Sequence, residues 1–182
     1  MELTNKQKGV IGETAVVLEL LKRGFDVINI NNSYLNYKNA DLICMNPNNG
    51  KSVMVQVKTG TTLNIFTGFT SEFDGTIQKL EESIIGPWVF VYMPDDKMSN
   101  MEFYILTREE VIKLISSSNK WYVTEWNRKL TSKPRVGVEV DWLKGESSKA
   151  SKENAKKQHP EYKSTLRQTS KDNWWKITQL LD

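Results

Sequence analysis

Two short segments of this sequence are apolar at every position, and they limit the fold more than any other feature. Residues Trp88–Tyr92 read WVFVY, and residues Phe103–Leu106 read FYIL. A strand with no polar face must be buried between two layers of other elements. We therefore predict that both segments lie in the centre of a sheet with helices on each side.

The surrounding patterns predict the order of the other elements. Thr4 and Gln7 form a capping box before a helical pattern that ends at Gly24. Thr107 and Glu110 form a second one after the apolar strands. Between them we predict strands at 25–30, 41–45 and 52–58 and a helix at 76–85. This order predicts an α/β fold with a mixed central sheet flanked by helices, an αβββαβ core.

Composition excludes several classes of protein. Hydrophobic residues make up 38% of the chain and charged residues 26%, as in ordinary folded domains. No apolar run is long enough to span a bilayer and no secretory signal is visible, so we expect a soluble, cytoplasmic protein. The single cysteine, Cys44, lies in a strand pattern and is expected to be a buried, unreactive thiol. The single histidine, His159, excludes mechanisms that need two.

Charge divides the chain into two parts. Residues 1–119 carry 11 basic and 14 acidic residues, a net charge of −3, whereas residues 120–182 carry 14 and 8, a net charge of +6. The basic part could follow a phosphate backbone or could be a solvated lysine-rich loop. We predict a core at 1–118 and a basic, Trp-rich extension at 119–182 that packs back on it through a closing helix. The apolar stripe of that helix comprises Trp174, Ile177 and Leu181.

The tryptophans of the extension have two possible roles. They could stack on nucleic-acid bases, because lysines are interleaved with them, but packing in the core is favoured for most of them. The five residues concerned are Trp121, Trp126, Trp142, Trp174 and Trp175.

One carboxylate is predicted on the apolar side of the first helix. At 100° per residue Glu13 shares a stripe with Val17 and Leu20, whereas Glu19 and Lys22 project away from it. Burying an unpaired carboxylate costs several kcal/mol. Glu13 therefore needs a salt bridge, a hydrogen-bond network or a metal ion.

Three further polar residues are expected to meet at one end of the predicted hairpin. Gln56 and Lys58 lie two residues apart on one face of their strand, and Asp41 opens the neighbouring strand. All three lie opposite the turn, so a carboxylate, an amide and an ammonium group converge. Oxygen ligands of this kind suit Mg²⁺ or Mn²⁺.

These residues resemble the signature of a nuclease superfamily. Glu13 in GETAVVLELLKRGFDV, Asp41 in NADLI, and Gln56 with Lys58 in VQVKTG are similar to the motif of the PD-(D/E)XK, or restriction-endonuclease-like, nucleases. The superfamily includes Holliday-junction resolvases and tRNA-endonuclease-like folds. The resemblance covers residues 4–118 and implies a three-layer, restriction-endonuclease-like fold.

The resemblance also implies a Mg²⁺- or Mn²⁺-dependent endonuclease. Glu13, Asp41 and Gln56 would hold the metal, Lys58 would assist the attacking water, and DNA is favoured over RNA as the substrate. Many members act as dimers, so a homodimer is an open expectation.

Two positions depart from the motif, and two lysines outside it are weaker candidates. Ala40 stands where the motif has proline, and Gln56 replaces a carboxylate, so weaker metal binding is expected. Lys6 and Lys79 are candidates for contact with nucleic acid at the edge of the cleft, which the segment 61–74 is expected to border.

Structural explanations remain open for the same residues. Glu13 could pair with Lys58, Asp41 could cap a turn, and Gln56 could be exposed. The chain could also be an inactive nuclease fold that binds nucleic acid, or an accessory or immunity-type partner domain.

Overall fold

The computed structural model describes residues 3–32, 37, 39–70, 77–94, 100–124, 135–140, 143 and 170–182. Its elements are α1 (Asn5–Leu21), β1 (Asp26–Asn29), η1 (Ile30–Asn32), β2 (Leu42–Met45), β3 (Ser52–Gly60), β4 (Asn64–Thr70), α2 (Ile77–Ser83), β5 (Trp88–Tyr92), β6 (Glu102–Leu106), α3 (Arg108–Thr124), β7 (Arg135–Glu139) and α7 (Trp175–Thr178). None of the helices in the described ranges is both long and apolar enough to cross a membrane.

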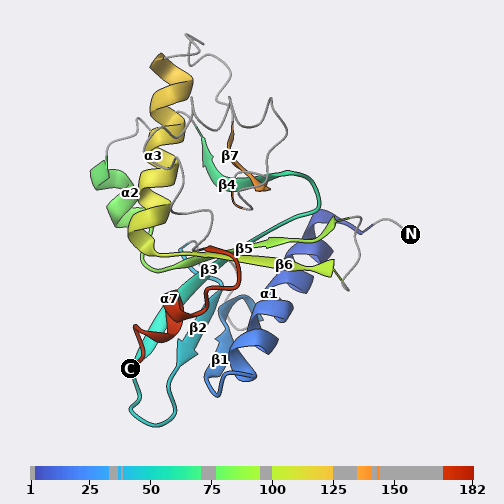
Figure 1. Ribbon diagram of the computed structural model, residues 1–182, viewed down its shortest axis with the longest axis vertical. Coiled ribbons are helices and arrows are strands. Elements are labelled where there is room, and N and C mark those ends of the chain that lie inside the picture. The colour runs from blue at the N-terminus through green and yellow to red at the C-terminus, as the bar shows by residue number, and fades with distance from the viewer. Residues whose placement is uncertain are drawn as a thin grey trace.

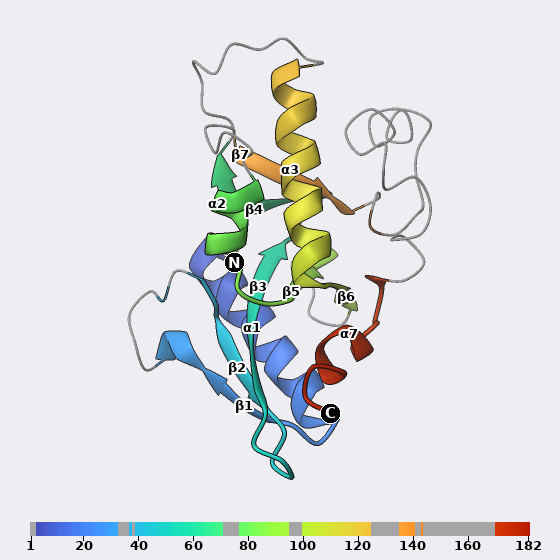
Figure 2. The ribbon, with the colours of Figure 1, turned by 90° about the vertical axis from the view of Figure 1, so that its left-hand side faces the viewer.

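A mixed five-stranded sheet forms the centre of the fold, in the order β1-β2-β3-β5-β6. The β3–β5 pair is parallel and the other neighbours are antiparallel. Helix α1 covers one face, while α2 and α3 cover the other (Figures 1 and 2). The predicted mixed sheet between helical layers is confirmed. Strand β4, which the sequence did not predict, pairs with β7 in a second, two-stranded sheet.

The local signals that start and stop the helices behave as expected. Thr4 Oγ1 accepts a hydrogen bond from the backbone N–H of Gln7, and Gln7 Oε1 accepts one from Thr4, at 3.3 and 2.8 Å. Thr107 Oγ1 likewise accepts a hydrogen bond from the backbone N–H of Glu110 at 3.2 Å, and Glu110 Oε2 accepts one from that of Thr107 at 2.8 Å. Gly24 has a φ of 85°, which a residue without a Cβ adopts at little cost, and α1 ends just before it.

The prediction that both apolar strands lie in the centre of the sheet is wrong for β6. Strand β5 is an inner strand, but β6 is at the edge. Its side chains Tyr104 and Ile105 are nevertheless fully buried. A C-terminal segment covers the open edge. The backbone N–H of Asp172 donates to the carbonyl of Phe103 at 2.9 Å, and Lys171 forms an isolated antiparallel β-bridge with Tyr104. An apolar edge strand is therefore shielded by the chain itself.

The C-terminal third contributes to the apolar cores on both sides of the sheet. Val136 and Val138 of β7 pack with α2 and α3, while Trp174, Ile177 and Leu181 pack with α1. The division predicted after residue 118 falls inside α3 and remains a prediction. His159 and the side chains of Trp121, Trp126 and Trp142 lie outside the described residues.

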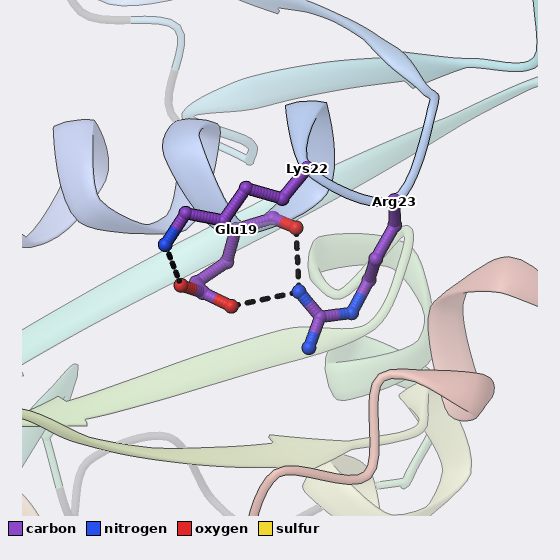
Figure 3. Close-up of polar contacts among 3 residues, drawn as sticks. All are labelled: Glu19, Lys22 and Arg23. Atoms are coloured by element: carbon purple, nitrogen blue, oxygen red, sulfur yellow. Dashed lines mark hydrogen bonds and ion pairs between the residues drawn. The ribbon is translucent and has the colours of Figure 1, made fainter.

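The end of α1 meets this C-terminal segment. Glu19 accepts hydrogen bonds from Lys22 at 2.9 Å and from Arg23 at 2.7 Å (Figure 3). The guanidinium of Arg23 lies 4.7 Å from the ring centroid of Trp174. Glu19 and Lys22 thus form a polar cluster beside the core, in agreement with their predicted direction. Cys44 is buried, and burial raises the pKa of its thiol to about 11.

Candidate active site

Glu13 is positioned by an unusually close approach of α1 to β3. A Cβ added to Gly12 would lie only 1.9 Å from Thr59 Oγ1, so only glycine permits this contact. Thr59 Oγ1 is itself buried and has no hydrogen-bond partner among the residues that the structure describes. The next residue along the helix, Glu13, is half-buried. Gly12 was not predicted from the sequence, where its only signal is a small residue beside the carboxylate on the buried stripe.

Asp41 lies at the start of β2 and is almost fully buried, at 8% exposure. Its backbone N–H donates to the carbonyl of Val55 at 3.0 Å. Its Oδ2 accepts hydrogen bonds from the backbone N–H of Val57, at 2.7 Å, and from Nε2 of Gln56. The carboxylate is thus held against β3 by the two residues that follow Val55, the first register partner of β2.

Gln56 and Lys58 share one face of β3, as the strand period predicts. Their register partners on β5 are Trp88 and Phe90, which belong to the core on the α2 and α3 side. Val55 and Val57 point to the opposite face and pack with α1. Gln56 is 6% exposed, and Nζ of Lys58 lies 5.4 Å from the ring centroid of Trp88. Asp41 and Gln56 are therefore in direct contact at the end of the hairpin opposite its turn.

Two asparagines that were not predicted as site residues complete the cluster, Asn29 at the end of β1 and Asn31 in η1. Asn29 Nδ2 donates to Oε2 of Glu13 at 3.0 Å. Asn31 Nδ2 contacts both carboxylates, Oε1 of Glu13 at 3.4 Å and Oδ1 of Asp41 at 2.9 Å. Their only sequence signal was the spacing of two amides at the end of a strand, which is too common to single them out.

Burial in the cluster disfavours the charged forms of Glu13 and Lys58. Burial raises the pKa of the Glu13 carboxyl and the charge of Asp41 raises it further, while the bonds from Asn29 and Asn31 lower it. Burial lowers the pKa of the Lys58 ammonium, and the charges of Asp41 and Glu13 oppose that effect. The folded state therefore loses stability as the pH rises through the pKa of Glu13 and its carboxyl ionises. The charged form of Lys58 likewise lowers the stability of the folded state relative to its neutral form. Such arrangements are characteristic of functional sites.

The structural explanations for the four residues do not match this geometry. Glu13 makes hydrogen bonds to two asparagines, and no described carboxylate lies within ion-pair distance of Lys58. Asp41 binds side chains and a strand N–H rather than capping a turn, and Gln56 is buried.

A polar cavity of about 210 Å³ opens beside Gln56 and Lys58. Thr67, Gly68 and Phe69 of β4 form one wall, so this part of the segment 61–74 borders the cavity. The other residues that line the cavity are Asn39, Ser83 and Trp88. A larger, mostly apolar hollow of about 500 Å³ lies between α1 and β6, and none of the four predicted residues lines it.

The two weaker candidates are not brought into the cluster. Lys6 is exposed two turns before Glu13, about 10 Å along the helix axis. Lys79 is exposed on α2. Neither lysine is among the groups that shift the pKa of Glu13 or Lys58.

The donors available to a metal are two carboxylates and amide groups. Within the described ranges, no set of three His, Cys, Asp or Glu residues is placed to hold a metal ion. Glu13 and Asp41 nevertheless turn one oxygen each toward the same atom of Asn31. Hard oxygen donors fit Mg²⁺ or Mn²⁺, with water filling the other positions. Gln56 presents its amide nitrogen to Asp41, so its oxygen becomes a ligand only after the amide turns over.

Comparison with known proteins finds structural similarities, which include two nucleases. No family model and no curated protein matches the sequence. A bacterial homing endonuclease aligns with 59% of this chain and 68% of its own, at 20% identity and a TM-score of 0.38. A Holliday junction resolvase from the archaeal hyperthermophile Archaeoglobus fulgidus aligns with 70% and 83%, at 12% identity and a TM-score of 0.37. At these TM-scores, the function of this chain has to be inferred from its own side chains.

Proposed function

We propose that this protein is a metal-dependent nuclease that hydrolyses phosphodiester bonds, with DNA favoured over RNA as the substrate. The observation that carries the proposal is the convergence of Glu13, Asp41 and Lys58, three charged groups held together without a close ion pair between them. Burial disfavours the charged forms of Glu13 and Lys58, and charged groups kept in such surroundings concentrate at functional sites. The preference for DNA rests on the resemblance of these residues to the PD-(D/E)XK signature.

In this proposal Glu13 and Asp41 supply carboxylate oxygens to Mg²⁺ or Mn²⁺, and Gln56 supplies its amide oxygen after turning over. The bound metal would polarise the phosphodiester and lower the pKa of water. Lys58 places its ammonium group at the wall of the polar cavity, where it can orient a water molecule and stabilise negative charge that develops on the phosphate. Val57 and Gln56 keep Asp41 in one orientation through its Oδ2.

Asp41→Asn tests the proposed activity with the smallest change of shape. Labelled linear, supercoiled and branched DNA and structured RNA are incubated with the protein and Mg²⁺ or Mn²⁺. We expect wild type to cut at least one substrate and Asp41→Asn to lose at least about 100-fold in rate, because a charged ligand is removed. Asp26→Asn, which removes the same charge from an exposed position on β1, is the control and should cut like wild type. If Asp41→Asn cut every substrate as fast as wild type, the cleavage would come from a contaminating nuclease.

Gln56→Glu tests the role of the amide. We expect Mn²⁺ affinity to rise about tenfold, because a carboxylate adds a charged ligand. Without metal the variant should be less stable than wild type, because the bond from Gln56 to Asp41 becomes a contact between two carboxylates. Calorimetric Mn²⁺ titration and thermal denaturation with and without Mn²⁺ measure both effects. Gln7→Glu, which keeps the capping box of α1, is the control, and unchanged affinity in Gln56→Glu would remove Gln56 from the ligand set.

A second candidate is an inactive nuclease fold that binds nucleic acid or a protein partner. It is favoured by the amide at position 56 and by the lack of a third metal-binding side chain of the His, Cys, Asp or Glu type in the described part of the chain. This candidate predicts salt-sensitive binding to nucleic acid that persists in EDTA and in Lys58→Ala. Absence of both cleavage and Mn²⁺ binding in wild type would favour it.

A further inference from the structure

Asn29 and Asn31 lie beside the candidate metal site, and a hydrogen bond fixes their relative position. Oδ1 of Asn29 accepts the backbone N–H of Asn31 at 3.0 Å, so the end of β1 and the start of η1 fix the two side chains relative to each other. Both amides then direct hydrogen-bond donors at carboxylate oxygens of Glu13 and Asp41.

Each carboxylate has one oxygen held by the fold and one that faces Asn31. Oε2 of Glu13 is held by Asn29, and Oδ2 of Asp41 is held by Val57 and Gln56. The opposite oxygens, Oε1 and Oδ1, both contact Nδ2 of Asn31. A single amide group therefore supplies the partial positive charge between two negative groups.

We propose that Asn29 and Asn31 are positioning residues with opposite effects on the metal. Asn29 holds Glu13 in the orientation that binds a divalent cation, whereas Asn31 occupies the place between the carboxylates and withdraws when the cation binds. The inference rests on the proposed metal site, and it adds that the Asn31 amide competes with the cation for Glu13 and Asp41.

Distances explain why the amide and the cation exclude each other. Mg²⁺ and its oxygen ligands lie about 2.0–2.1 Å apart. The hydrogen bonds of Asn31 are 2.9 and 3.4 Å long, so both carboxylates must close on the cation in the space that the amide now fills. The bond from Asn29 to Oε2 does not conflict with a cation at Oε1. Outer hydrogen bonds of this kind commonly improve metal affinity by about tenfold or more.

The test is Mn²⁺ affinity measured by calorimetry on the full chain. We expect Asn31→Ala to bind Mn²⁺ about three- to tenfold more tightly than wild type, because charge-assisted hydrogen bonds no longer compete. Asn29→Ala should bind about tenfold more weakly. Thermal denaturation in EDTA should show both variants folded and both less stable than wild type, because each loses hydrogen bonds. A merely structural role would not move Mn²⁺ affinity in opposite directions.

Asn49→Ala is a closely matched control. Like Asn29, Asn49 accepts a backbone N–H two residues later, from Lys51 at 2.9 Å, and donates to a distant oxygen, that of Leu181 at 2.8 Å. It should lose stability without any change in Mn²⁺ affinity. If wild type binds Mn²⁺ and Asn31→Ala binds it equally or more weakly, the competitor role is overturned while the proposed nuclease stands. If wild type binds no Mn²⁺, the metal site and this inference fail together.

Discussion

Replacing Lys58 with methionine is expected to slow phosphodiester cleavage by about 100- to 1,000-fold, the usual effect of removing one preorganised group that stabilises transition-state charge. Methionine keeps an unbranched apolar side chain of similar length to the lysine stem and removes the ammonium group. Because Lys58 repels a nearby cation, Mn²⁺ affinity should stay equal or increase. Initial rates at saturating Mg²⁺ and a calorimetric Mn²⁺ titration measure the two effects separately.

Lys113→Met is the control for loss of a lysine, because Lys113 is exposed on α3. Lys58→Arg adds a test of pH dependence. Burial lowers the pKa of Lys58, so wild-type cleavage should begin to fall at a lower pH than is usual for a lysine-dependent rate. Arginine stays charged, and any activity that Lys58→Arg retains should lack this alkaline fall. An unchanged rate in Lys58→Met would exclude Lys58 from the reaction.

Trp174→Ala is expected to lower the free energy of unfolding by about 3–5 kcal/mol, as truncation of a buried tryptophan usually does. The Trp174 side chain is 4% exposed, and its ring centroid lies 5.4 Å from that of Phe103 on β6. Arg23 covers the same ring. Whole domains have about 5–15 kcal/mol of stability, so this single change removes a large part of it. Urea unfolding followed by circular dichroism measures the loss.

The neighbouring residue provides the control. Trp175 is 64% exposed, so Trp175→Ala should change stability by no more than about 0.5 kcal/mol. Equal losses in the two variants would contradict the docking of this segment against α1 and β6. The pair also measures how much a segment far from the predicted site in sequence contributes to the sheet that carries it.

Local chemistry made much of the fold predictable. The Thr4 and Thr107 capping boxes, the stop at Gly24 and the period of two in β3 all depend on residues a few positions apart. Interactions between residues this close in the sequence do not depend on the tertiary structure, so they can be predicted from the sequence. The common face of Gln56 and Lys58 followed from the same rule.

Long-range packing determined the features that the sequence analysis missed or misplaced. Strand β6 is apolar although it lies at the edge, because residues near 171 cover it. Strand β4 pairs with β7, about 70 residues further along the chain, and its own pattern gave no sign of that partner. Contacts across such separations depend on where each element comes to rest in the fold.

The candidate site shows the same division. The sequence by itself predicted four candidate residues, because Glu13, Asp41, Gln56 and Lys58 are polar at positions where their elements should be buried. Only the tertiary structure brought Asn29 and Asn31 to the two carboxylates, since their partners lie 10 to 18 residues away on other elements. An asparagine at the end of a strand gives the same sequence signal whether it faces water or a carboxylate, and the packing of α1 against β1 to β3 makes that difference.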